Sequence, residues 1–286
     1  MKPSADQLAN GQLIGNAILN ALPPRPHDSH KGDFGSVGIL GGAPGMTGAV
    51  LLTARAALHL GAGKVYAASL SSSITIDFMQ PEIMLLGPTQ LLDTALTVLA
   101  VGPGLGRSEQ ASQLLKIALQ SLAILVLDAD ALNLLAESQS LKKLAQNRTS
   151  PTLLTPHPGE AAQLLGCDTR IIQRDRPAAA LQLVEKYRAW VVLKGANSIC
   201  AAPDKAWRIN ATGNPALSSA GMGDVLTGMV AALLAQGVAP FAALQLAVYL
   251  HGAAADALVQ QGVGPVGLTA SEVMLEARRL LNQHTV

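Results

Sequence analysis

The chain has 286 residues, of which 49 % are hydrophobic and 14 % are charged, and its formal net charge is +1. So apolar a composition excludes an intrinsically disordered chain and predicts a large buried core. Aromatic residues make up only 3 %, and without basic tracts or stacking aromatics the sequence gives little support to nucleic-acid binding.

The two cysteines, Cys167 and Cys200, do not have the CxxC spacing of a redox or metal motif. The N-terminal segment lacks the long apolar core of a secretory signal peptide. We therefore expect two free thiols and a cytoplasmic protein.

The first part of the chain predicts a helix followed by a β-α-β unit. Residues 4–21 have an amphipathic helical pattern and lead into a proline-rich segment that ends near residue 27. An apolar strand at 37–40, a glycine-rich turn, a helix at about 47–60 and a second strand at 65–68 come next. Because a β-α-β crossover joins parallel strands, this unit predicts a parallel sheet.

The alternation of strands and helices continues to about residue 209. Apolar runs predict strands at 83–86, 97–101, 124–127, 152–154 and 191–193, a hairpin at 198–201 and 206–209, and helices near 108–120, 130–136, 159–165 and 175–188. No linker or low-complexity segment interrupts the series. The expected fold is therefore one α/β domain over residues 1–286, with three α/β/α layers and a mostly parallel central sheet.

No charged residue occurs between Asp224 and Asp256. Gly237 and Pro240 divide this stretch, and each half contains a glutamine, which disfavours a membrane span. We expect two buried helices here, with one face in a subunit contact.

Six loops are rich in glycine or charge. Five follow predicted strands, and the sixth leads into the first of the two uncharged helices. In an open α/β sheet the carboxyl ends of the strands form the edge that binds ligands. None of the six is a GxGxxG dinucleotide fingerprint or a GxxxxGK[ST] phosphate loop, so a Rossmann dehydrogenase and a P-loop enzyme are disfavoured. The loops read GGAPGMTGA (41–49), VGPGLGRS (101–108), LDADALN (127–133), LTPHPGEAAQLLG (154–166), VVLKGANS (191–198) and AGMGD (220–224).

The AGMGD segment opens an apolar helix that runs to about Gln236. Gly221 and Gly223 allow the backbone to approach a ligand closely, and the N–H groups of a helix start attract anions. Asp224 lies in the same first turn. It is either a carboxylate that caps the helix, which is the commoner role of an acid there, or a general base beside a phosphate cradle.

His157 lies between two prolines, three residues before Glu160. The pair is either a turn histidine with a first-turn glutamate, or an imidazole and a carboxylate next to a metal–phosphate group. Lys194 ends a buried strand, and because its ammonium group must reach solvent or an anion, we expect it to contact a ligand.

Asp128 and Asp130 follow another buried strand. They either cap the next helix or contribute side chains to the site. His30, His59 and His251 are predicted to be structural or surface residues.

Eight segments, taken in order, resemble the motifs of one family. They are similar to those of the ADP/ATP-dependent NAD(P)H-hydrate dehydratases of the ribokinase-like superfamily, and they cover about residues 28–280. The epimerase domain that is often fused to this family is missing from the sequence, so we expect a stand-alone dehydratase. The segments are HKGDFG, GGAPGMTGA, VGPGLG, DADALN, LTPHPGE, LKGA, and NATGNP followed by AGMGDVLTG.

The resemblance implies a ribokinase-like fold and the repair of hydrated NADH and NADPH, in which water has added to the nicotinamide ring. The S epimer would be dehydrated at the expense of ADP or ATP, with Mg²⁺ as cofactor. Because hydroxide is a poor leaving group, the ring hydroxyl is first phosphorylated, and phosphate then leaves as the double bond is restored.

The resemblance also implies a role for each site residue. Asp224 would be the base at the substrate hydroxyl, and the N–H groups of Gly221, Met222 and Gly223 would form an anion hole. Contacts to the nucleotide would come from Lys194, Gly195, Ala196, Asn197, Ser198 and Gly223. Contacts to the hydrated dinucleotide would come from Ala49, Gly106, His157 and Asp224. Glu160 is a candidate Mg²⁺ ligand that would act through water.

Two positions depart from the family pattern. Met222 stands where the family usually has threonine, and Ala216 where it tends to have glycine. A methionine that donates only its backbone N–H would change little, whereas loss of a hydroxyl–phosphate contact would alter nucleotide affinity. Because alanine is strained at positive φ, we expect ordinary backbone angles at Ala216.

The partners implied by the resemblance are the hydrated dinucleotide, an adenine nucleotide and a separate epimerase. A homotetramer is also suggested, and neither nucleic acid nor a membrane is expected as a partner. Two other functions stay open. A kinase of the same superfamily, acting on a vitamin or sugar alcohol, would share Asp224 and the anion hole, although GGAPGMTGA and LTPHPGE favour the dehydratase. The second alternative is a non-catalytic nucleotide sensor.

Overall fold

Most strands of the computed structural model lie at or within a few residues of the predicted apolar runs. The structure describes residues 12–71 and 74–284. Their strands are β1 (Gln12–Leu13), β2 (Ser36–Gly41), β3 (Lys64–Ser69), β4 (Met84–Leu85), β5 (Val98–Val101), β6 (Ile124–Leu127), β7 (Thr152–Leu154), β8 (Trp190–Leu193), β9 (Ile199–Ala201) and β10 (Trp207–Ile209).

Within the described residues these strands form one ten-stranded sheet in the order β1-β10-β9-β8-β7-β6-β5-β2-β3-β4. β8, β9 and β10 pair antiparallel, as the predicted hairpin requires, and the other neighbours pair parallel. β2 lies between β3 and β5, so the strand order reverses there. The loops after β2 and β5 therefore meet at a topological switch point, where open α/β sheets bind ligands. The prediction of a mostly parallel sheet is confirmed.

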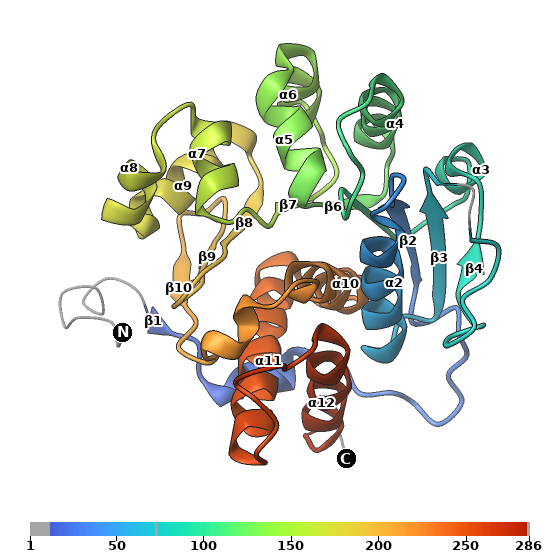
Figure 1. Cartoon of the computed structure of the whole chain (residues 1–286), viewed down its shortest axis with the longest axis vertical. Coiled ribbons are helices and arrows are strands. Elements are labelled where there is room, and N and C mark those ends of the chain that lie inside the picture. The colour runs from blue at the N-terminus through green and yellow to red at the C-terminus, as the bar shows by residue number, and fades with distance from the viewer. Residues whose placement is uncertain (1–11, 72–73, 285–286) are drawn as a thin grey trace.

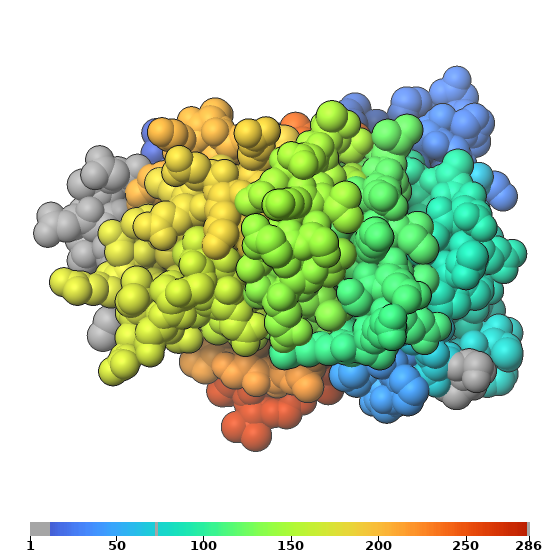
Figure 2. Space-filling view, turned by 90° about the horizontal axis from the view of Figure 1, so that it is seen from above, coloured from blue at the N-terminus to red at the C-terminus, as the bar shows by residue number. Residues whose placement is uncertain are grey.

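Helices cover both faces of the curved sheet and give the three expected layers (Figure 1). Figure 2 looks onto the outer layer, where the chain from about α4 to α9 forms much of the surface, coloured green to yellow. The inner layer consists of the 3-10 helix η1 (Asn16–Ala21), α2 (Thr47–His59), α10 (Met222–Ala235), α11 (Pro240–Gln260) and α12 (Ala270–Asn282), and the outer layer of α3 (Pro88–Leu92), α4 (Glu109–Gln120), α5 (Ala129–Glu137), α6 (Gln139–Gln146), α7 (Pro158–Leu165), α8 (Thr169–Arg174) and α9 (Arg176–Tyr187).

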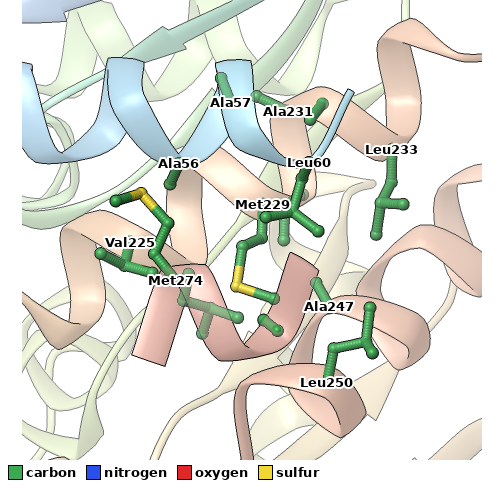
Figure 3. Close-up of a cluster of buried hydrophobic side chains, with 14 of the residues drawn as sticks. Ala56, Ala57, Leu60, Val225, Met229, Ala231, Leu233, Ala247, Leu250 and Met274 are labelled. Carbon is green, nitrogen blue, oxygen red and sulfur yellow. The ribbon is translucent and has the colours of Figure 1, made fainter. Parts of the chain in front are cut away.

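α10 is enclosed on nearly all sides, because apolar residues follow one another around its whole circumference. Residues 225–235 are all buried, and the helix contacts α2, α11, α12 and the middle of the sheet. Figure 3 shows Met229 of α10 in one cluster with Leu60, which follows α2, Leu250 of α11 and Met274 of α12. The packing of the core therefore fixes where the N-terminus of α10 lies.

α11 is the second half of the stretch without charges. By length and composition it could cross a membrane, with a mean hydropathy of 1.4 over its most apolar window. In the fold 61 % of that window is buried, against η1, α10 and α12. Because core helices of soluble proteins pass the same test, this is weak support for a span, and the two expected buried helices are present.

The helix predicted at 4–21 is wrong where the structure describes it. Gln12–Leu13 forms the edge strand β1 beside β10, and Ile14 N–H continues this pairing by donating to Ile209 O at 2.9 Å. Asn16–Ala21 forms a 3-10 helix that Gly15 begins with extended backbone angles. Pairing with the sheet thus overrides the local helical pattern, and residues 4–11 lie outside the described residues.

Three short helices have no counterpart among the predicted elements. α3, α6 and α8 have five, eight and six residues. Segments of this length are too short to show the 3.6-residue period that predicts a helix.

Gly228 gives a test of the contact between α10 and α2. A Cβ at this position would lie 2.2 Å from the backbone oxygen of Thr53 and 2.7 Å from Ala56 Cβ. Gly228→Ala should push the helices apart and lower the free energy of unfolding by about 2–3 kcal/mol, as overpacking of a core does. At Gly48 of α2 nothing lies within 4 Å of the same atom, so Gly48→Ala should not destabilise. Urea unfolding of both variants measures the difference, and equal stabilities would contradict the close contact.

Candidate functional site

The loops after β2 and β5 lie against each other at the switch point. Ala43 N–H donates to Gly104 O at 2.6 Å, and a Cβ at Gly104 would lie 3.3 Å from Ala49 Cβ in α2. Gly106 N–H donates to Asp130 Oδ2 at 2.8 Å, which ties the second loop to the start of α5. The structure therefore places Ala49, at the start of α2, beside the loop that contains Gly106, and both residues are predicted to contact the hydrated dinucleotide.

The predicted nucleotide residues line a pocket of about 1080 Å³. Residues 194–198 form one wall, and His157, Met222 and Gly223 also belong to the lining. Another part of the lining is formed by residues 210–215 with the 3-10 helix η2 (Pro215–Ser218). The pocket is large enough for a nucleotide. The structure thus brings together the predicted nucleotide loop and the start of α10, whereas Ala49 and Gly106 are not part of this lining.

Lys194 is the centre of a buried charge cluster. Its Nζ lies 2.6 Å from Asp128 Oδ1 and 4.0 Å from Glu160 Oε2. Thr227 of α10 donates from Oγ1 to Asp128 Oδ2 at 2.8 Å. Burial by itself lowers the pKa of Lys194, but the negative charges of Asp128 and Glu160 outweigh it and raise this pKa. The ammonium group is therefore charged and paired with anions of the protein itself.

The pKa of Asp224 is shifted by its burial and by two neighbouring charged groups, Asp128 and Lys194. Burial and the neighbouring Asp128 raise the pKa of its carboxyl group to about 6, although Lys194 acts in the opposite direction. A carboxylate that caps a helix through hydrogen bonds has a lowered pKa instead. The structure therefore favours the interpretation of Asp224 as a general base, because a pKa near the working pH suits proton transfer.

The start of α10 is shaped to bind an anion. Gly221 precedes the helix with a φ of +84°, and a Cβ there would lie 2.6 Å from Leu52 Cδ1 of α2. Only glycine combines this angle with so close a contact at no strain. In the described part of the chain no side chain caps the helix, so its first N–H groups are left for an external anion.

The interpretation of Asp128 and Asp130 as helix caps is wrong. Asp128 precedes α5, but in the described structure its side chain makes no capping hydrogen bond, because Lys194 and Thr227 occupy the carboxylate. Ala129 follows with a φ of +46°, a left-handed conformation that is strained for alanine. This turn aims Asp128 at the charge cluster, while Asp130 accepts from Gly106.

The structure confirms the first interpretation of His157 and Glu160, a turn histidine with a first-turn glutamate, and the metal–phosphate interpretation stays a prediction. They form a capping box at the start of α7, in which His157 Nδ1 accepts from Glu160 N–H at 3.2 Å and Glu160 Oε2 accepts from His157 N–H at 2.8 Å. His157 also lines the pocket, and Glu160 is buried near Lys194. Burial raises the pKa of Glu160, against the opposing charge of Lys194.

The two departures from the family pattern fit the fold. Ala216 lies in η2 and does not have a positive φ, so the expected ordinary backbone angles are confirmed. Met222 is 4 % exposed and its side chain belongs to the inner core. The backbone N–H of Met222 is therefore the group that it can offer to a ligand.

His251, predicted to be structural or surface, is buried and lines the pocket. Burial lowers its pKa to about 4, against a hydrogen bond with the backbone of Met222 that raises it. The imidazole is therefore neutral at physiological pH. Neither His251 nor Thr227 could be found from the sequence, because each fits the periodic pattern of its helix.

The wall formed by residues 210–215 is fastened to α11. Asn210 Nδ2 and Thr212 Oγ1 each donate to a backbone carbonyl of α11 at 3.0 Å. Gly213 N–H donates to Asp256 Oδ2 at 2.8 Å. The polar residues of the NATGNP motif thus serve to hold this wall in place against α11.

The described residues contain no group of three or more His, Cys, Asp or Glu side chains able to hold a metal ion. Asp128 and Glu160 both lie near Lys194, which neutralises part of their charge. Mg²⁺ commonly binds through one or two carboxylates together with substrate phosphates. The side chains therefore fit a metal ion that arrives with a nucleotide, with Glu160 as the candidate ligand, better than a resident metal centre.

Comparisons with known sequences agree over most of the chain. A sequence model of the NAD(P)H-hydrate dehydratase family matches residues 37–276. The ADP-dependent (S)-NAD(P)H-hydrate dehydratase of Neisseria meningitidis is 41 % identical over 283 residues, which are 96 % of this chain and 95 % of that protein. The bifunctional NAD(P)H-hydrate repair enzyme Nnr of Coxiella burnetii is 40 % identical over 276 residues, which are 94 % of this chain and 55 % of that protein. The chain thus spans about half the length of such bifunctional relatives.

A solved structure is similar throughout the fold. The ADP/ATP-dependent NAD(P)H-hydrate dehydratase of Bacillus subtilis, co-crystallised with ATP and Mg²⁺, matches with a TM-score of 0.85 at 30 % identity. The match covers 96 % of this chain and 99 % of that chain. The expected ribokinase-like fold is confirmed.

Asp224→Asn should stabilise the folded protein at neutral pH. Because the pKa of Asp224 is raised from 3.8 to about 6, the folded state holds a proton between about pH 4 and 6 that the unfolded state has released. Stability is therefore lost as the pH rises through this window. The uncharged amide avoids the loss, so the variant should gain roughly 2 kcal/mol at about pH 7.5 and little at about pH 4.

Chemical unfolding at both pH values measures this gain. Asp93→Asn, at an exposed position after α3, is the matched control and should leave stability unchanged at either pH. A gain from Asp224→Asn that does not depend on pH would contradict the raised pKa.

Proposed function

The chain belongs to the NAD(P)H-hydrate dehydratase family, and we propose that it restores hydrated NADH and NADPH to the intact dinucleotides at the expense of ADP or ATP. On this proposal it is a carbon–oxygen lyase that repairs a damaged metabolite. The relative from Neisseria meningitidis is named for the S epimer of the hydrate and for ADP, and we extend both to this chain.

One observation carries the proposal: Asp224 lies in the first turn of an uncapped helix start that lines a nucleotide-sized pocket. Its raised pKa provides a base near neutral pH. The N–H groups beside it suit the oxygens of a phosphoryl group. These are the parts needed to transfer a phosphoryl group from a nucleotide to a hydroxyl group.

In the first step Asp224 accepts the proton of the ring hydroxyl while the hydroxyl oxygen attacks the terminal phosphorus. The bond from that phosphorus to the bridging oxygen breaks, which leaves AMP from ADP or ADP from ATP. The negative charge that develops lies at the start of α10, where the N–H groups of Gly221, Met222 and Gly223 and the helix dipole stabilise it. Lys194 adds a positive charge on the same side.

In the second step phosphate leaves, because it is a better leaving group than hydroxide. The carbon–oxygen bond breaks as the lone pair of the ring nitrogen moves toward that carbon, and loss of a proton from the neighbouring carbon restores the double bond. On this proposal Ala49, Gly106 and His157 hold the dinucleotide in place. Binding energy from these remote contacts lowers the barrier by orienting the ring.

Mg²⁺ belongs to the proposal because it accompanies ATP in the Bacillus subtilis structure. When bound it would neutralise charge on the phosphates. Glu160 is buried close to Lys194, and we propose that it holds the ion through water.

A kinase that phosphorylates a vitamin or sugar alcohol would need the same base and the same anion site. These residues therefore do not separate the two functions. The names of relatives that match nearly the whole chain favour the dehydratase. A non-catalytic nucleotide sensor would bind nucleotide without turnover, and the assay below distinguishes all three.

The partners and the location are part of the same proposal. We propose a homotetramer that works with a separate epimerase in the cytoplasm, and without a nucleic-acid or membrane partner. The near-neutral charge supports the absence of a nucleic-acid partner, and the free thiols of Cys167 and Cys200 support the cytoplasm. A monomeric mass in light scattering would remove the tetramer.

Mixing the protein with hydrated NADH, Mg²⁺ and either ADP or ATP should restore the near-UV absorbance of reduced nicotinamide and release phosphate. Asp224→Asn should reduce this rate at least about a thousandfold, because the base is lost, while nucleotide binding survives. Asp93→Asn is the control and should keep the wild-type rate. Consumption of nucleotide without recovery of absorbance would favour the kinase, and wild-type rates in Asp224→Asn would remove the assigned base.

The rate should also depend on pH through Asp224. Because the base works only when ionised, kcat/KM should fall tenfold per pH unit below about pH 6, where the pKa of its carboxyl group lies. A profile that is flat from about pH 5 to 8 would contradict this assignment.

A further inference from the structure

We propose that Arg176, at the start of α9, is a positioning residue that holds the nucleotide loop (residues 194–198) in its binding conformation and turns a backbone N–H of that loop toward the nucleotide. The inference rests on the proposed function only in taking an adenine nucleotide as the ligand of this loop. Arg176 belongs to neither the motifs of the sequence analysis nor the lining of the pocket.

The guanidinium of Arg176 spans three carbonyl groups. Nη2 donates to Leu193 O at 3.1 Å and to Lys194 O at 3.2 Å, and Nη1 donates to Ala196 O. These carbonyls belong to the end of β8 and to the turn that follows it. A single planar group therefore satisfies carbonyl groups at the start and in the middle of the nucleotide loop.

Arg176 is not neutralised by an acid. Burial alone lowers its pKa, and no acidic neighbour acts on it. Its Nε is buried and lacks a hydrogen-bond partner among the described residues. Since arginine stays charged in proteins, a positive charge without an ion pair among the described residues lies directly behind the loop that is predicted to contact the nucleotide. This placement suits an anion on the other side of the loop.

The contact to Lys194 also sets the direction of a donor. In a planar trans peptide the C=O of one residue and the N–H of the next point in opposite directions. Because Lys194 C=O points at Arg176, Gly195 N–H points away from it, to the side on which residues 194–198 line the pocket. Within the described residues this N–H has no hydrogen-bond partner, so it is free to donate to a ligand oxygen.

Gly195 and Arg176 depend on each other. Gly195 has a φ of +138°, and a Cβ there would lie 3.0 Å from Arg176 Nη2. A side chain at this position would therefore strain the backbone and displace the guanidinium. If the two residues act as one unit, their substitutions should not be additive.

The test is calorimetric titration with ADP of the wild-type protein, Arg176→Met and Arg176→Lys. Arg176→Met should raise the Kd about tenfold to a hundredfold, because the loop loses charge-assisted hydrogen bonds and must be ordered on binding. Arg176→Lys should raise it less, about threefold to tenfold, since an ammonium group cannot span all three carbonyl groups. Arg174→Met, at an exposed position of α8, is the matched control and should leave the Kd within about twofold.

Steady-state rates separate positioning from a general loss of structure. In Arg176→Met the KM for nucleotide should rise by the same factor as the Kd, while kcat stays within about threefold because Asp224 and the start of α10 are untouched. The KM for hydrated NADH should not change. Gly195→Ala should resemble Arg176→Met, and the double variant should be no worse than the weaker-binding single variant.

An unchanged Kd in folded Arg176→Met would overturn the proposal. So would a fall in kcat that equals the loss of affinity, because this indicates a disturbed fold. If Arg176→Met does not fold, Arg176→Lys decides, and a wild-type Kd in that variant has the same consequence. Should the wild-type protein bind ADP without restoring hydrated NADH, the proposed function fails, while the titrations still decide the role of Arg176.

Discussion

The buried ion pair between Lys194 and Asp128 is the interaction on which the site depends. It joins the end of β8 to the end of β6, and Thr227 ties α10 to the same carboxylate. Removing one partner would leave an unpaired charge in the interior, at a cost of about 3–5 kcal/mol. Asp128, Glu160 and Asp224 share this one ammonium group, so negative charge is in excess. That excess adds to the effect of burial in raising the pKa of Asp224, and the cluster that keeps Lys194 charged therefore also increases the proton affinity of the Asp224 carboxylate.

Core packing places the anion site beside this cluster. α10 is buried around its whole circumference, Gly228 lets it approach α2, and Gly221 fits against Leu52 of α2. A helix held in this way cannot shift its N-terminus without disturbing the core. Its N–H groups are thus oriented before a ligand arrives, which is the condition for effective electrostatic stabilisation of a transition state. The burial of Asp224 and the strained backbone at Ala129 each lower the stability of the fold locally, and the surrounding structure compensates for this loss.

The proposed nucleotide pocket is held from both helix layers. Arg176 of α9, in the outer layer, contacts the carbonyls behind residues 194–198. In another part of the lining, α11 of the inner layer holds residues 210–215 through hydrogen bonds. Irregular segments of this kind would be mobile if left to themselves, because the sheet does not pair their backbone groups. Fixing both walls from behind lowers the entropy that is lost on binding a nucleotide.

The sequence by itself determined the alternation of strands and helices, the parallel sheet and the loops of the site, because hydrophobic period and glycine punctuation are local signals. The order of its motifs also determined the family. Only the tertiary structure decided that Gln12–Leu13 pairs with β10 instead of continuing a helix, and that Asp128 meets Lys194 instead of capping α5. The raised pKa of Asp224 and the contacts of Arg176 were likewise decided only by the tertiary structure. Each depends on burial or on a short distance between residues far apart in the chain, and no local pattern encodes either quantity.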